Sequence, residues 1–118
     1  MMIAIPVDEN KTSVCVSFGR APYFMTHNTE NGKTEIVENP AASAQGGAGI
    51  RAAQLITDQK ANALITVRCG ENAAEVFHAA GIKLYQADGA DANRNIEALK
   101  NGNLAPLTHF HAGFHEKQ

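Results

Sequence analysis

The sequence has little of what marks several specialised classes of protein. Its 118 residues include two cysteines, which are too few for a disulfide framework. The net charge of −2 provides no basic surface for nucleic acid, and the apolar runs are too short to span a bilayer. The opening residues lack the basic start of a signal peptide. We therefore expect a protein of the reducing cytoplasm, with free thiols and without nucleic-acid or membrane partners.

The apolar run at residues 2–7 indicates a buried strand, because turn-forming residues end it after a short stretch. A strand that is apolar on both faces needs cover on both sides, which favours the middle of a parallel or mixed sheet. Two further strands are predicted at 23–28 and 34–38, joined as a hairpin by the turn at Asn31 and Gly32. The polar character of 34–38 is typical of an edge strand.

Helices and strands alternate in the second half of the chain. Helices are predicted from residue 48, over 71–80 and over 91–102, with strands at 64–67 and 82–86. The residues expected on the buried helix faces are Ala48, Ala52, Leu55 and Ile56 in the first helix, Ala73, Phe77 and Ala80 in the second, and Ile96 and Leu99 in the third.

Right-handed crossovers then determine the order of the strands. They place 64–67 beside the first strand and 82–86 beyond it, so the sheet order is 3-2-1-4-5 and only the second strand is antiparallel. The predicted fold is α/β and ribonuclease-H-like, with three layers formed by a five-stranded mixed sheet and three helices. We expect a single domain over 1–108 and a histidine-containing tail over 109–118.

This topology brings the loops that follow four of the strands to one edge of the sheet, where open α/β sheets bind their ligands. Cys15 and Cys69 are expected there, and their thiolates suit a soft metal or an iron–sulfur cluster. Arg20 and Arg68 at the same edge would lower the pKa values of both thiols. Alternatively, the cysteines are small buried hydrophobic residues, since two thiols cannot fill a tetrahedral site and no C-x-x-C pair is present.

Two other groups of residues are expected at this edge. Gly46 and Gly47 precede a helix, where their N–H groups would face an anion or where they simply let the loop fold closely. The acids Asp8, Glu71 and Asp88 lie at strand ends and would suit Mg²⁺ in a nuclease, or serve as ordinary caps and turn residues.

The tail contains three histidines within seven residues, at His109, His111 and His115. Imidazoles so close in sequence would suit Zn²⁺, Ni²⁺ or iron. The alternative is a frayed terminus whose histidines are solvated.

The motifs Ile-Ala-Ile-Pro-Val-Asp-Glu at 3–9 and Phe-Gly-Arg-Ala-Pro-Tyr-Phe at 18–24 resemble the opening of the dinitrogenase iron–molybdenum cofactor biosynthesis family. The resemblance continues through 39–40, 47–55 and 81–85. Members of that family often have a histidine before the Phe-Gly pair, where this chain has Ser17. The resemblance implies the same fold, and a ligand that is an iron–sulfur cluster or a precursor of the iron–molybdenum cofactor.

We therefore predict non-enzymatic binding or transient carriage of an iron–sulfur-type metallocluster or cofactor precursor, exchanged with donor and acceptor proteins. One alternative is a regulatory module that binds a protein or a small anion, with structural cysteines. The other is a Mg²⁺-dependent nuclease-like enzyme, which the lack of a basic surface disfavours. The candidate site residues are Ser17, Phe18, Gly19, Arg20, Gly46, Gly47 and Arg68 for the cofactor, and Cys15 and Cys69 for the metal.

Overall fold

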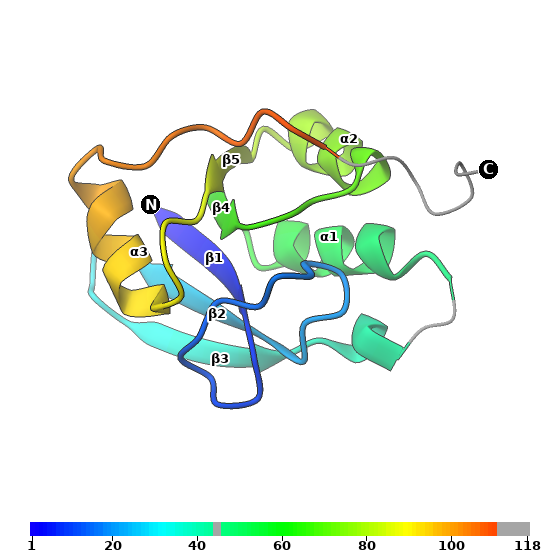
Figure 1. Cartoon of the computed structure of the whole chain (residues 1–118), viewed down its shortest axis with the longest axis horizontal. Coiled ribbons are helices and arrows are strands. Elements are labelled where there is room, and N and C mark those ends of the chain that lie inside the picture. The colour runs from blue at the N-terminus through cyan, green and yellow to red at the C-terminus, as the bar shows by residue number, and fades with distance from the viewer. Residues whose placement is uncertain (44–45, 111–118) are drawn as a thin grey trace.

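The computed structural model of the protein describes residues 1–43 and 46–110 (Figure 1). The strands in these residues are β1 (Met2–Val7), β2 (Tyr23–Asn28), β3 (Thr34–Glu38), β4 (Ala63–Thr66) and β5 (Lys83–Gln86). The α-helices are α1 (Ala48–Asp58), α2 (Glu71–Ala79) and α3 (Ala92–Lys100), and a short 3₁₀ helix, η1, covers Pro40–Ser43.

The five strands form one sheet in the order β3-β2-β1-β4-β5. β2 is antiparallel to both of its neighbours, β1 and β3, whereas β4 is parallel to β1 and β5 is parallel to β4. The predicted order, the central position of β1 and the single reversed strand are all confirmed. The ribonuclease-H-like label stays a prediction.

β1 is central because both of its faces are apolar. Ile3, Ile5 and Val7 belong to one buried cluster, which also contains Ile96 and Leu99 of α3. The alternate residue Ala4 belongs to a second cluster, which contains residues of α1 and α2 such as Ala52, Ile56 and Phe77. The two clusters make three layers, with α1 and α2 on one side of the sheet and α3 on the other (Figure 1).

The inward face of α2 differs from the predicted one. Ala80 is exposed and follows the end of the helix, whereas Ala74 is buried beside Ala73 and Phe77. The helix is one residue shorter than the pattern predicted, so Ala80 lies outside it and does not pack against the sheet. The pattern also did not predict η1, since its composition is typical of a loop.

The segment after α3, residues 103–110, lies along β5 and continues towards α2 (Figure 1). Its backbone accepts a hydrogen bond from Gln86 N at Ala105 O (2.8 Å) and donates one from Leu107 N to Leu84 O (3.0 Å). The ring of Phe110 meets the ring of His78 edge-on, with centroids 6.0 Å apart. Packing therefore extends as far as Phe110, and the predicted division of the chain at 108 stays a prediction. No helix in the described part of the chain is long and apolar enough to cross a membrane.

Candidate functional site

The carboxyl edge of the sheet, where β1, β3, β4 and β5 end, is crossed by the β1–β2 loop (residues 8–22). Isolated bridges hold this loop in place: Val14 pairs with the end of β1, Ser13 pairs with Asp91, and Ser17 pairs with Arg68. The bridge between Ser17 and Arg68 joins the loop of Cys15 to the loop of Cys69. Both thiols therefore belong to the same edge, as the topology predicted.

Phe18 anchors the loop in the protein interior. Its side chain is 3% exposed and its ring centroid lies 5.6 Å from that of Phe24 and 5.3 Å from that of Phe77. The cofactor contact that we predicted for Phe18 stays a prediction; in the structure its buried ring positions the neighbouring residues. Ser17 and Arg20 on either side of the Phe-Gly pair are exposed.

Gly19 lies directly against the first turn of α1. A Cβ atom at this position would come within 3.0 Å of the Gly49 Cα and N atoms, so a side chain does not fit without a shift of backbone. Asn39 holds the same turn, because its side-chain amide donates to the carbonyl oxygens of Gly19 (3.2 Å) and Ala21 (2.8 Å). Its own oxygen accepts from the Ala41 N–H (3.1 Å). These long-range contacts set the conformation of the Phe-Gly-Arg turn.

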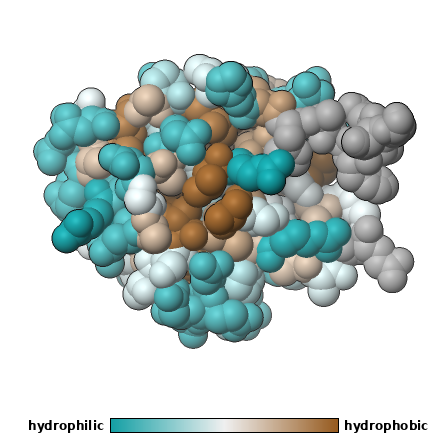
Figure 2. All heavy atoms as spheres, in the orientation of Figure 1, coloured by the Kyte–Doolittle hydropathy of each residue, from teal (hydrophilic) through white to brown (hydrophobic). Residues whose placement is uncertain are grey.

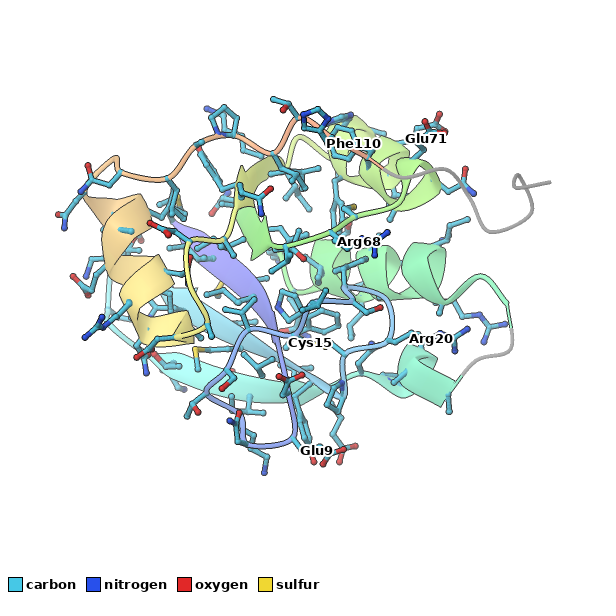
Figure 3. All side chains as sticks on the ribbon, in the orientation of Figure 1. Glu9, Cys15, Arg20, Arg68, Glu71 and Phe110 are labelled. Atoms are coloured by element: carbon cyan, nitrogen blue, oxygen red, sulfur yellow. The ribbon has the colours of Figure 1, made fainter. Side chains whose placement is uncertain are left out.

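Several exposed arginines lie at this edge of the sheet. Arg20 donates to the Ala42 carbonyl oxygen (3.1 Å), and Arg68 is exposed just before α2. Figure 3 shows Cys15, Arg20 and Arg68 on the same side of the molecule. Arg51 is also exposed and lies in the first turn of α1. We did not predict a role for Arg51 from the sequence. The glycines before α1 mark where the helix begins, and this is the sequence signal that locates Arg51 at the edge.

The helices that begin at this edge differ from one another in their N-terminal caps. α1 begins after Gly47, which has a φ of 70°, and α2 begins after Gly70; neither has a side-chain cap. In contrast, the Asp91 carboxylate caps α3 by accepting from the Asn93 and Arg94 N–H groups. The first turns of α1 and α2 therefore present N–H groups that no capping side chain occupies, which suits an anion. Gly46 and Gly47 are both exposed beside the first of these turns.

The two thiols are more basic than predicted. Burial raises the pKa of Cys69 to about 11. Burial also raises the pKa of Cys15; a hydrogen bond from the Ser17 backbone opposes that shift, and the Asp8 carboxylate reinforces it. The predicted lowering of both pKa values by Arg20 and Arg68 is therefore wrong, because loss of hydration is the main cause of both shifts.

In residues 1–43 and 46–110, no three His, Cys, Asp or Glu side chains lie close enough to hold a metal ion together. Asp8, Glu71 and Asp88 are exposed, and they do not form the cluster that a nuclease would need. His109 lines a cleft of about 240 Å³ together with Arg68 and Cys69. His111 and His115 lie outside the described residues.

The surface of the β1–β2 loop contains an apolar residue that the sequence did not distinguish from core residues. Val16 is 57% exposed, between the half-buried Cys15 and the exposed Ser17. Figure 2 shows apolar surface near the middle of this face, with hydrophilic residues around it. An exposed large apolar side chain beside cationic groups is suited to contact with another molecule.

Comparison with known proteins gives a consistent result. A family model described as dinitrogenase iron-molybdenum cofactor matches residues 1–102. The apo form of the orange protein from Desulfovibrio gigas superposes with a TM-score of 0.84 at 28% identity, covering 91% of this chain and 92% of that one. A provisionally assigned NifB protein from Thermotoga has a TM-score of 0.78 at 36% identity, with coverage of 92% and 95%.

A provisionally assigned dinitrogenase from Methanocaldococcus jannaschii shares the fold, with a TM-score of 0.72 at 22% identity and coverage of 92% and 96%. No curated protein matches the sequence.

Proposed function

The chain belongs to the dinitrogenase iron-molybdenum cofactor family, and from this membership we propose that it binds and transiently carries an iron–sulfur-type metallocluster or a precursor of the iron–molybdenum cofactor. In this proposal the protein does not transform its cargo. Donor and acceptor proteins supply and receive the cluster at the carboxyl edge of the sheet.

The observation that carries the proposal is the pair of helices that begin without side-chain caps beside exposed arginines. Metal–sulfur clusters coordinated by sulfide and thiolate are anionic, so they need compensating positive charge and hydrogen-bond donors. The first turns of α1 and α2 supply N–H groups and the positive ends of two helix dipoles. Arg20 and Arg68 supply guanidinium groups, which suit the recognition of anions.

The thiols fit a carrier better than a permanent metal centre. Cys15 and Cys69 are the only thiols in the sequence, and both have raised pKa values, so each must lose a proton to ligate iron. Without a third nearby ligand among the described residues, a bound cluster keeps positions open for exchange. Exchange of ligands at such positions is what release to an acceptor requires. The orange protein has been solved in an apo form, which agrees with a ligand that can be removed from this fold.

The test is anaerobic reconstitution with Fe²⁺ and sulfide, with and without molybdate, followed by absorption spectroscopy and metal analysis. We expect brown protein whose metal is removed by a chelator. Cys15→Ser and Cys69→Ser should each lose most of the uptake while keeping the circular dichroism of the parent. Arg68→Met should lower the uptake severalfold, whereas Lys83→Met, an equal charge change at the opposite end of the sheet, should leave it unchanged.

The proposal is wrong if both cysteine variants take up iron and sulfide as well as the parent does. The exposed Val16 then favours the second candidate function, a regulatory module that binds a protein or small anion at the same edge, with structural cysteines. In that case Val16→Ser would weaken partner binding without changing metal content.

A further inference from the structure

A cleft of about 240 Å³ lies where β4 ends, between the β4–α2 connection and the segment after α3. Two of its lining residues carry ligands for transition metals, the Cys69 thiol and the His109 imidazole. Cys69 is 1% exposed, whereas His109 is exposed. The two groups come from positions forty residues apart in the chain, so only the fold brings them to one cavity.

His109 is not on a loose end. The backbone of Leu107, two residues earlier, donates to Leu84 O of β5 (3.0 Å), and the Leu107 side chain is buried. The next residue, Phe110, packs its ring against His78. Anchors on both sides therefore keep the imidazole beside the cleft, and the entropy cost of bringing it to a metal ion is reduced.

The chemistry of the pair selects a class of metal. A thiolate and an imidazole together suit Zn²⁺ and the softer transition-metal ions, and they do not suit Mg²⁺ or Ca²⁺. Because no third such side chain joins them among the described residues, two or more coordination positions remain for exogenous ligands. Arg68 lines the same cleft, so anionic exogenous ligands such as sulfide have a guanidinium beside them.

We propose that Cys69 and His109 bind one transition-metal ion in this cleft and leave its remaining positions to exogenous anionic ligands. Binding breaks the S–H bond, the proton goes to solvent, and no electron is transferred. The inference deepens the proposed function, on which it rests, by naming the point at which the metallocluster is attached to the chain.

Other histidines of the chain provide controls. His27 lies near the end of β2, away from the carboxyl edge, and its Nδ1 lies 2.7 Å from the Thr34 hydroxyl oxygen. His111 and His115 are close to His109 in sequence, so their contribution has to be separated from that of His109 by substitution in the full chain.

The experiment titrates the full-length, reduced protein with Co²⁺ under anaerobic conditions and follows the near-ultraviolet sulfur-to-cobalt charge-transfer band. We expect one Co²⁺ per chain and a charge-transfer band in the parent, in His27→Gln and in the double variant His111→Gln/His115→Gln. The band should disappear in Cys69→Ser and in Cys69→Ala. The alanine variant is included because a buried serine hydroxyl can itself destabilise the fold. His109→Gln should raise the dissociation constant at least about tenfold, since metal sites lose tenfold or more even when a supporting partner is removed.

A charge-transfer band that survives in both Cys69 variants overturns the inference, and so does an unchanged dissociation constant in His109→Gln. The outcome is separable from that of the proposed function. If Co²⁺ binding fails while iron and sulfide uptake persists, only the Cys69–His109 pair is wrong. If Co²⁺ binds as expected while iron and sulfide are not taken up, the metal site stands and the carrier function fails.

Discussion

Substitution of Gly19 by alanine tests how the site is built, because the new Cβ atom has no room. It would meet the Cα and N atoms of Gly49 at 3.0 Å and the carbonyl carbon of Ala48 at 3.4 Å. These atoms are backbone at the start of a helix, so they cannot rotate away as the end of a side chain would. Overpacking of this kind costs about 1–3 kcal/mol. Because alanine makes the unfolded chain less flexible than glycine does, about 0.4–1 kcal/mol of this loss of stability is offset.

Gly46→Ala is the matched control, because no atom lies within 4 Å of the position that its Cβ would take. We expect Gly19→Ala to lower the free energy of unfolding by about 1–2 kcal/mol and Gly46→Ala to leave it unchanged or slightly raised. In urea, with a slope of about 1–3 kcal/mol/M, a loss of about 1.5 kcal/mol moves the midpoint down by roughly 0.5–1.5 M. If Gly19→Ala unfolds at the same urea concentration as Gly46→Ala, the close approach of the loop to α1 is not present in solution.

Three further predictions follow from the same structure. Burial raises the pKa of Cys69 from 9.0 to about 11, so its contribution to stability is complete below pH 9 and is lost as the pH rises towards 11. The loss should reach about 2 kcal/mol in urea unfolding at the upper pH and be absent in Cys69→Ala; equal losses in both proteins would contradict it. Asn39→Asp should destabilise the protein by at least about 2 kcal/mol in the same assay, because a carboxylate replaces the amide that donates to the Gly19 and Ala21 carbonyl oxygens. A midpoint equal to that of the parent would mean that this amide does not hold the turn. With Mg²⁺ or Mn²⁺ the protein should not cleave an RNA–DNA hybrid, and cleavage that is lost in Asp8→Asn would show the opposite.

Much of the architecture is determined by short-range patterns. Residues 2–7 are apolar on both faces, and this pattern predicts a central strand whatever the rest of the chain does. The hairpin turn at Asn31 and Gly32 is a local choice of backbone conformation, since Gly32 has a φ of 74°. With two right-handed crossovers these local signals leave only one sheet order, and that order brings Cys15 and Cys69 to one edge.

The chemistry of the site depended on the tertiary structure. Arginines near cysteines in sequence predicted acidic thiols, but burial by distant residues raises both pKa values instead. Sequence also did not show that Asn39 holds the Phe-Gly-Arg turn, or that His109 shares a cleft with Cys69. Secondary structure and strand order follow from periodicity and chain handedness, which act between near neighbours. Hydration of a thiol, room for a Cβ atom and the meeting of two ligands depend on atoms that only the folded chain brings together.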